Sequence, residues 1–266
     1  METEKGYDLV VGADGAFSRV RSALSAIRPE YSGIGGYDTF IAQASAGTRA
    51  LLKGGSVFAF SDGKALIAQQ MGHGRVSVSA WGIRGESWAE GLRGSSSEMN
   101  RKRKGPSIEE ILEEYKTWAP ELTTLLQQST GDIRQSAFYA LPADFRWEHK
   151  PGITLIGDAA HLMTPFAGEG VNIALDDARR LARVLVSDGS VKEFEEEMFG
   201  RAAKAQALTR KMTQAMFFTP GAPRSTIESW VVARATYDCP ESIEKVVKPF
   251  LVAGVYSFYW VFKKFI

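Results

Sequence analysis

The sequence contains few of the residues that build metal centres or disulfide frameworks. Cys239 is the single cysteine among 266 residues, so the chain can form neither an internal disulfide nor a cysteine-based zinc site. The three histidines, His73, His149 and His161, are far apart in the sequence. We therefore expect no metal site, and we expect any cofactor to be an organic molecule.

An excess of charge of one sign is also absent. Lys and Arg total 32 against 31 Asp and Glu, a net charge of +1, which argues against a general attraction to nucleic acid. The basic run 101–104 stands inside the polar segment 95–105 and is expected to be a solvated loop. The N-terminus is polar and has no apolar region of a signal peptide. These features favour a cytoplasmic protein without a nucleic-acid partner.

A long hydrophobic run is missing as well, although the C-terminus comes near to one. Residues 250–262 are apolar and aromatic, and Lys263 and Lys264 follow them, but the run is shorter than the roughly 20 residues of a membrane-spanning helix. A buried terminal helix is one interpretation. A helix lying on a membrane surface is another, because aromatic and lysine side chains suit the headgroup region; a disordered tail is a third. Membrane association through the tail 218–266 stays open.

The chain does contain enough apolar material for a core. Hydrophobic residues make up 44% of it, and its length allows one large domain or two smaller ones. Residues 7–11 are expected to form a short strand, which the turn GADG at 12–15 ends. Residues 18–26 then predict a short helix that stops before Pro29. The sequence thus opens with a strand, a turn and a helix.

Residues 31–149 differ in pattern and are expected to form a β-sheet domain. Strands 56–60 and 64–70 flank Asp62-Gly63, a pair typical of a tight hairpin. In 75–81, Val and Ala alternate with Ser and Trp, which predicts a strand with one packed face and one more open face.

Helices and a returning strand are expected later in the same domain. Residues 107–110 form a capping box that begins one helix, and Pro120 can open a second at its first position. Residues 136–141 are expected to return to the core as a strand, in which Phe138 and Tyr139 either approach a cofactor or pack in the core.

A second strand, turn and helix unit, at 153–186, is the most informative part of the chain. The apolar strand 153–156 stops at Gly157-Asp158, and a loop containing Pro and Gly leads into a helix that begins near Gly168. Unpaired amides and the positive dipole end of such a helix favour an electron-rich partner. A long helix, 193–217, is expected to follow.

The two acidic turns share one layout. Asp14 follows the strand that ends at Gly12, and Asp158 follows the strand that ends at Gly157. Both carboxylates are therefore expected at the carboxyl ends of parallel strands, where α/β sheets bind ligands. Either aspartate alone would more simply be a turn former or a helix cap, but the pair, with glycines after the second, favours a dinucleotide site in which a carboxylate accepts a hydrogen bond from a sugar hydroxyl.

These residues resemble a known family. GADGAFSRVR at 12–21 resembles the DG motif of the para-hydroxybenzoate hydroxylase-like flavoprotein monooxygenases, and GDAAH at 157–161, continued through Pro165 to Asp177, resembles their GD motif. The likeness is nearest to the tetracycline-degrading type and its fungal relatives, and it extends over about residues 7–217.

The resemblance implies a mixed α/β fold with three parts. A partial FAD-binding, Rossmann-like domain is expected from residues 1–30 and 150–217, with 31–149 inserted as a substrate-binding β-sheet domain. Residues 218–266 are expected to add C-terminal helices. The implied cofactor is FAD, reduced by NADPH or NADH.

The resemblance also implies roles for particular residues. Asp158 would bond the ribityl chain of FAD, the helix start would face the pyrimidine edge of the flavin, and Pro165 would lie beside the ring where oxygen reacts. Asp14 would support the pyrophosphate region, and Arg21 would help to bind the nicotinamide donor. His161 is expected to be a packed loop residue rather than a proton carrier. The expected cofactor-binding set is Asp14, Gly15, Arg21, Gly157, Asp158, Pro165, Gly168, Gly170, Val171 and Asn172.

The activity implied is hydroxylation or epoxidation of a small organic molecule, in particular a secondary metabolite, with no obligatory acid-base residue from the protein. One family feature, the Gly-x-Gly-x-x-Gly turn that grips the ADP pyrophosphate, is not found, and Gly33-Ile34-Gly35-Gly36 does not replace it. We therefore expect this chain by itself to bind FAD poorly and to expose apolar surface. A truncated, non-catalytic remnant and a membrane-associated accessory protein are the alternatives.

Overall fold

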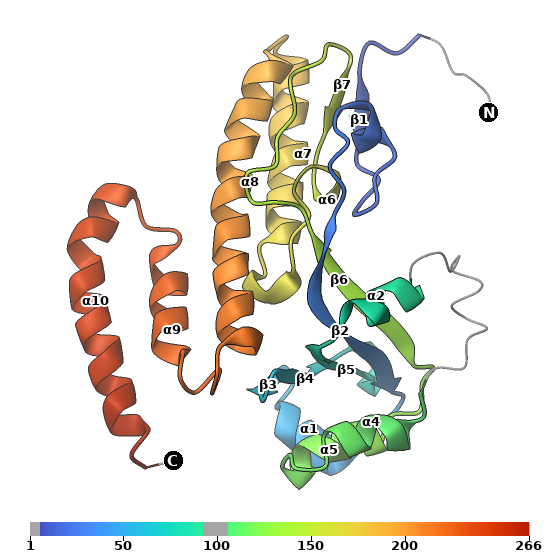
Figure 1. Ribbon diagram of the computed structural model, residues 1–266, viewed down its shortest axis with the longest axis vertical. Coiled ribbons are helices and arrows are strands. Elements are labelled where there is room, and N and C mark those ends of the chain that lie inside the picture. The colour runs from blue at the N-terminus through green and yellow to red at the C-terminus, as the bar shows by residue number, and fades with distance from the viewer. Residues whose placement is uncertain (1–5, 93–105, 266) are drawn as a thin grey trace. The chain divides into compact units, whose positions relative to one another are not determined.

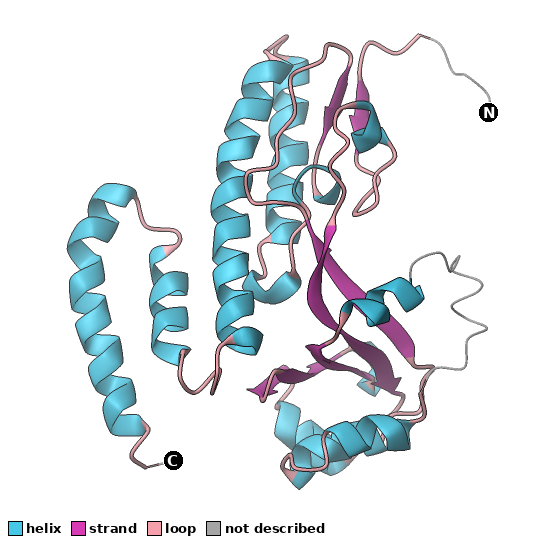
Figure 2. Cartoon of the chain, in the orientation of Figure 1, coloured by secondary structure: helices cyan, strands magenta, loops and turns pink. Residues whose placement is uncertain are grey.

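The computed structural model describes residues 6–92 and 106–265 (Figures 1 and 2), so the basic loop expected at 95–105 lies outside the described residues. The chain forms two compact units, which are described separately. Unit 1 contains residues 1–32, 139–215 and 227–266, so far as they are described, and unit 2 contains residues 33–138 and 216–226.

Unit 1 is built on two short parallel strands. β1 (Val10–Gly12) pairs with β7 (Ile153–Leu155), with Val10 opposite Ile153. The helix expected at 18–26 is shorter in the structure, a 3₁₀ turn over Val20–Ala23. The helices that follow are α6 (Asp158–His161), the 3₁₀ turn η3 (Pro165–Ala167), α7 (Gly170–Val186) and α8 (Val191–Thr213), and a π-helical turn, η4 (Gln214–Phe218), comes after α8.

The core of unit 1 lies between β7 and the long helices α7 and α8. Leu155, Leu181, Phe194 and Met198 are buried in one cluster there. Glu195 of α8 is also buried, and its carboxylate accepts hydrogen bonds from Thr154 (2.7 Å) and the Trp147 indole (3.2 Å), and contacts His149 Nδ1 at 2.7 Å. Because a buried carboxylate is costly unless it is bonded, this network fixes α8 against the strand that carries the second acidic turn.

Unit 2 is a five-stranded sheet with helices on one face. The strand order is β3-β4-β5-β2-β6. Tyr37, Leu66, Val78, Ile111 and Leu125 belong to the core cluster that joins the sheet to its helices. The strands are β2 (Glu30–Ile41), β3 (Ser56–Ser61), β4 (Lys64–Gln70), β5 (Val76–Ile83) and β6 (Arg134–Ala140), of which β2 begins in unit 1. The α-helices are α1 (Ala46–Leu52), α2 (Glu86–Leu92), α4 (Ile108–Glu114) and α5 (Pro120–Gln127).

Several local expectations for this region are confirmed. β3 and β4 form the expected hairpin, with positive φ at Asp62 (52°) and Gly63 (68°), as a tight primed turn requires. Ser107 caps α4 in a full capping box with Glu110, and Pro120 opens α5.

The sequence patterns did not predict β2, which runs through a glycine-rich stretch that favours a loop. Packing explains these glycines. A Cβ at Gly35 would lie 2.4 Å from the Trp88 indole nitrogen, and a Cβ at Gly36 would lie 2.2 Å from the Ala80 carbonyl oxygen. The glycines therefore allow β2 a close approach to α2 and β5, and long-range contacts outweigh the weak strand propensity of glycine.

The C-terminal residues form two helices, α9 (Ile227–Thr236) and α10 (Glu241–Phe262), which contact each other. The expectation that this tail is helical is therefore confirmed. The interpretation as a buried terminal helix is wrong, because Phe250 and Trp260 of α10 are 76% and 64% exposed. Among the residues that the structure describes, no helix combines the length and the apolar character needed to cross a membrane. The expected mixed α/β class, with an inserted sheet and C-terminal helices, is confirmed.

Candidate cofactor site

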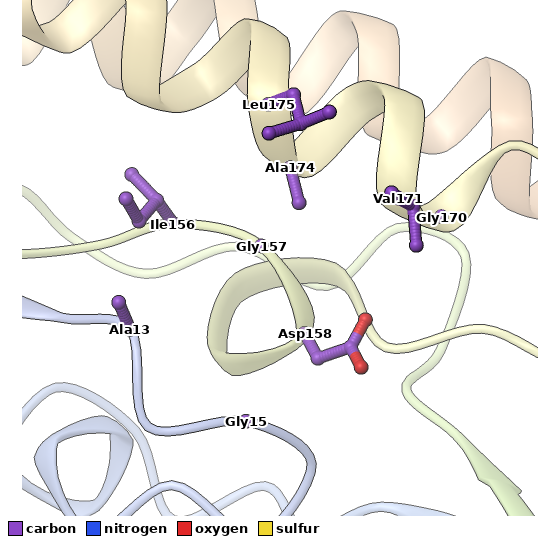
Figure 3. Close-up of a pocket in the computed structure, with 9 residues that line it drawn as sticks. All are labelled: Ala13, Gly15, Ile156, Gly157, Asp158, Gly170, Val171, Ala174 and Leu175. Atoms are coloured by element: carbon purple, nitrogen blue, oxygen red, sulfur yellow. The ribbon is translucent and has the colours of Figure 1, made fainter.

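The two acidic turns of unit 1 line one pocket, shown in Figure 3. The pocket has a volume of about 340 Å³, near the lower end of the range for ligand sites, so it has room for a segment of a dinucleotide rather than for all of it. Five of the expected cofactor-binding residues line it: Gly15, Gly157, Asp158, Gly170 and Val171.

Asp158 is the charged residue of this pocket. Its side chain is exposed, and Figure 3 shows its carboxylate extending from the turn on the side of Gly170 and Val171. No hydrogen bond or ion pair to this carboxylate is found among the described residues. Because ionised carboxylates accept hydrogen bonds strongly, Asp158 is available to a ligand hydroxyl.

Gly157 sets the direction of this turn. Its backbone has φ 61° and ψ −144°, a conformation open essentially only to glycine. A Cβ would also lie 3.2 Å from the Cβ of Ala174 in α7. Any side chain here would therefore strain the backbone and press on the helix that forms the opposite wall of the pocket.

A buried polar network fixes the same turn from behind. The Asp177 carboxyl accepts a hydrogen bond from the Gly157 amide (3.2 Å), contacts His161 Nε2 (2.5 Å) and pairs with Arg201 (3.2 Å). Asp177 is fully buried and His161 is 2% exposed. The expectation of His161 as a packed, hydrogen-bonded residue is confirmed, and the network joins the turn to both α7 and α8.

Asp14, the corresponding residue of the first turn, is used differently. One of its carboxylate oxygens accepts hydrogen bonds from the amides of Arg19 (2.7 Å) and Val20 (3.4 Å). Partial burial alone would raise the pKa of Asp14, but bonds from Ser18 and from these amides outweigh it and hold the pKa below its ordinary value. Asp14 therefore caps the 3₁₀ turn that follows it, and its expected support of the FAD pyrophosphate stays a prediction.

Arg21 joins the two motifs. Its side chain is buried, and its guanidinium donates to the carbonyl oxygens of Ala16 (2.6 Å), Ala159 (3.0 Å) and Asp158 (3.5 Å). Burial lowers the pKa of Arg21, and the charge of Asp14 partly offsets this effect. The guanidinium thus links the first turn to the start of α6. Its suggested role in holding the nicotinamide donor stays a prediction.

The start of α7 presents backbone amides on the pocket side. No side chain caps this helix, and its first turn contains no acidic residue. Glu169, at the cap position, is paired with Arg234 at 3.3 Å. The amides at the start of α7 are therefore open to an electron-rich ligand.

The other expected residues surround this helix start. Pro165 opens η3 and is exposed, Gly168 ends η3 in a left-handed conformation, and Asn172 donates to the Gly168 carbonyl at 3.4 Å. These three are outside the set that lines the pocket. Their expected contacts with the flavin stay predictions.

The two aromatic residues expected either near the cofactor or in the core have different surroundings. Tyr139 contacts Phe17 edge-on at 5.2 Å, in the segment that carries the first motif. Phe138 contacts Trp81 of the sheet unit at 4.8 Å. Both pairings are ordinary aromatic packing.

Four residues of the pocket wall were not predicted from the sequence motifs. Ala13, Ile156, Ala174 and Leu175 also line it. Helical spacing carried a signal for two of them, because Ala174 and Leu175 lie three and four residues after Val171 and so share its face of α7. Among the described residues, no group of three or more His, Cys, Asp or Glu side chains could hold a metal ion.

The part of the chain that carries these motifs is similar to known proteins. Residues 6–190 match the family model described as an FAD binding domain. The chain is 30% identical over 255 residues to monooxygenase penA of Penicillium thymicola and 29% identical over 262 residues to monooxygenase asqM of Emericella nidulans. Each match covers 78% of this chain and 59% of the relative, so the chain spans less than two thirds of the length of either.

The fold is similar to that of a solved hydroxylase. A salicylate hydroxylase in complex with its substrate superposes with a TM-score of 0.65 at 20% identity, over 95% of this chain and 64% of that one. At this identity the similarity concerns the fold alone. The family match, which includes both acidic turns and the start of α7, identifies the chain as a member of the FAD binding domain family.

Proposed function

We propose that this chain binds FAD as part of a flavin-dependent monooxygenase that uses NADPH or NADH and O₂. The observation that carries the proposal is the Asp158 carboxylate, which is unbonded in the described structure and lies in a pocket bounded by both acidic turns and the start of α7. Membership of the FAD binding domain family supports FAD as the ligand.

The residues of the pocket fit parts of FAD. Asp158 would accept a hydrogen bond from a ribityl hydroxyl, and the amides at Gly170 and Val171 would face the electron-rich pyrimidine edge of the flavin. The dipole of α7 would stabilise negative charge on the reduced ring. Ala13, Ile156 and Leu175 of the pocket lining would offer apolar surface to the flat ring. When bound, FAD supplies the transfer of oxygen, and we assign no catalytic residue in the protein.

We further propose that unit 2 covers the substrate. Its sheet has core helices on the face of Tyr37 and Leu66, whereas the other face carries Asp38, Trp81 and Phe138. Asp38 accepts hydrogen bonds from Ser79 (2.6 Å) and from the Trp81 indole (3.0 Å). A sheet face that combines aromatic rings with a fixed carboxylate suits a small organic molecule.

The substrate class is proposed by similarity. The two relatives compared above are named monooxygenases and come from fungi, which supports hydroxylation or epoxidation of a small secondary metabolite. A cytoplasmic location remains part of this proposal.

Titration of the purified chain with FAD tests the proposal. Because the Gly-x-Gly-x-x-Gly turn is not found in this chain, we expect weak but saturable quenching of flavin fluorescence that is much weaker still in Asp158→Ala, together with NADPH oxidation that depends on added FAD. Saturable binding without NADPH oxidation would indicate a non-catalytic remnant. Absence of saturable binding, or equal binding by Asp158→Ala, would contradict the assignment of the pocket to FAD.

A further inference from the structure

Helix α10 is apolar on two sides. Leu251, Val255 and Tyr259 recur every four residues and are partly buried, on a helix that contacts α9 (Figure 1). The outward side is apolar as well, although it is exposed. Its exposed apolar side chains are Ile243, Val246, Val247, Phe250, Phe258, Trp260 and Val261. A helix that is hydrophobic all round is normally covered on every side. We therefore expect another surface to cover the outward face of α10.

The uncharged part of α10 is too short to cross a bilayer. No charged residue occurs between Pro249 and Phe262. At about 1.5 Å per residue this span measures about 21 Å, against a hydrocarbon core of about 30 Å. Lys245 and Lys248 precede the span, and Lys263 and Lys264 follow it. Lysines at both ends of an apolar helix fit a position parallel to a membrane surface, where the ammonium groups reach the headgroups.

The region around α10 is also positively charged. Residues 201–266 contain ten Lys and Arg against four Asp and Glu, although the whole chain has a net charge of only +1. The charges act on each other in the folded structure, because the hydrogen bond from Lys248, with the charges of Lys204 and Lys211, lowers the pKa of Glu244. A positive region beside an apolar face is complementary to a surface of anionic lipid.

The C-terminal end of α10 has the side chains of an interfacial helix. Lys264 Nζ lies 3.4 Å from the centre of the Trp260 ring, and Lys263 pairs with Glu228 of α9 at 2.7 Å. A groove of about 860 Å³ runs beside them. Its lining joins aromatic and cationic groups: Glu228, Tyr256, Ser257, Trp260, Val261, Lys263 and Lys264. Tryptophan, tyrosine and lysine are the residues that favour the boundary between acyl chains and headgroups.

A protein partner fits this face less well than lipid does. Between Pro249 and Phe262, Tyr256 and Ser257 carry the exposed side-chain hydroxyls, and this span offers no amide or charged side chain. Stable protein interfaces carry about one hydrogen bond per 100–200 Å² to fix their register. A bilayer requires no such register, because its surface is laterally uniform.

We propose that α10 lies in the surface of a bilayer that contains anionic phospholipid, with Val246, Phe250 and Phe258 in the acyl boundary and the flanking lysines among the headgroups. The contact is peripheral, and it leaves the cofactor pocket unchanged. The proposal does not depend on the assignment of FAD.

Flotation of the full chain with lipid vesicles tests this proposal. We expect the chain to float with phosphatidylcholine vesicles that contain phosphatidylserine and to float much less with phosphatidylcholine alone. The double substitution Phe250→Glu with Phe258→Glu should reduce binding by about tenfold or more, because it replaces two membrane-facing phenyl rings by charges. Phe58→Glu is the matched control, since Phe58 is 59% exposed on β3 in unit 2, and it should bind as the unaltered chain does.

A second measurement requires no substitution. Phospholipids brominated on the acyl chain should quench part of the tryptophan fluorescence of the unaltered chain in vesicles that contain phosphatidylserine, because Trp260 would lie at the acyl boundary. Absence of both flotation and quenching would overturn the proposal. So would equal binding by the double variant, or a concentration-dependent dimer in light scattering that Phe250→Glu with Phe258→Glu abolishes and that excludes vesicles.

Discussion

The two acidic turns of unit 1 have almost the same sequence layout and different structural uses. Each follows an apolar strand, and the two strands pair in parallel. At the first turn the carboxylate of Asp14 is bonded to the amides of Arg19 and Val20. At the second turn, the carboxylate of Asp158 faces the pocket without a partner among the described residues.

The difference follows from what comes after each aspartate. The chain after Asp14 folds back as a 3₁₀ turn, and the Asp14 carboxylate accepts hydrogen bonds from two amides at its start. Asp158 is itself the first residue of α6, and a different residue, Asp177, binds the amide of the second turn. A carboxylate at the end of a strand is therefore available to a ligand only when another group accepts the hydrogen bonds of the backbone amides in its turn.

The largest expected effect comes from removing that other group. Asp177→Ala should lower the free energy of unfolding by about 3–5 kcal/mol, because it leaves Arg201, His161 and the Gly157 amide without their buried partner. Urea denaturation of the purified chain measures this loss.

Asp176→Ala is the matched control, at the adjacent position. Asp176 is partly exposed and pairs with Arg179, with Arg180 and, at 3.5 Å, with Arg201, so its loss should cost about 0–1 kcal/mol. Hydrogen bonds from Arg179 and Arg180 lower the pKa of Asp176 to about 2, so its contribution is present above the ordinary carboxyl pKa and disappears as the pH falls towards 2. Equal losses for the two variants would mean that the buried network does not hold the second turn.

Arg21→Met tests whether the two turns depend on each other. It removes the hydrogen bonds to the Ala16 and Ala159 carbonyl oxygens, so the free energy of unfolding should fall by about 2–3 kcal/mol, as expected for bonds from a charged donor. Arg19→Met, at an exposed neighbouring position, should change it by no more than about 0.5 kcal/mol. If Arg21 instead serves the nicotinamide donor, Arg21→Met would leave the stability unchanged and weaken NADPH binding.

Asp158→Ala separates ligand binding from stability. The free energy of unfolding should stay nearly constant, because the carboxylate has no described partner to lose. The affinity for FAD should fall by about 10- to 100-fold, the range for one hydrogen bond to a charged group. Calorimetric titration with FAD measures it. A destabilised variant with unchanged affinity would give Asp158 the structural role that we assign to Asp14.

Asp14→Asn should have the smallest effect. The loss of the charged acceptor should lower the free energy of unfolding by about 1 kcal/mol at neutral pH. Because the folded-state pKa of Asp14 is lowered, its stabilisation is present above the ordinary carboxyl pKa and is lost as the pH falls through the folded-state pKa. The stability difference should therefore shrink in acid, and FAD affinity should change less than in Asp158→Ala. A larger loss of affinity would support the predicted role of Asp14 near the pyrophosphate.

Local sequence patterns predicted the elements that depend on local interactions. The Asp62-Gly63 hairpin, the Ser107 capping box and the Pro120 helix start all formed as expected, because backbone conformation and nearby hydrogen bonds decide them. The long strand β2 was missed, since its glycines are explained by Trp88 of α2 and by Trp81 of β5, both distant in sequence.

At the site, too, local patterns predicted some features, whereas contacts between distant segments decided others. The motif pattern located Gly157, Asp158 and the start of α7, and the pocket contains all three. It did not indicate that Asp14 would cap its own turn, that Arg21 would bond to three carbonyl groups, or that Asp177 would bind the Gly157 amide. Those contacts join residues from separate segments, whose distances no sequence spacing specifies.

The sequence by itself determined the family, the two acidic turns and the apolar C-terminal run, because each depends on residue type and spacing along one segment. Only the tertiary structure decided which carboxylate stays available to a ligand and which face of α10 stays exposed. The physical reason is that polar groups take the nearest partner in space and apolar groups are buried by whichever neighbours pack on them. Both choices depend on elements that are brought together only in the folded chain.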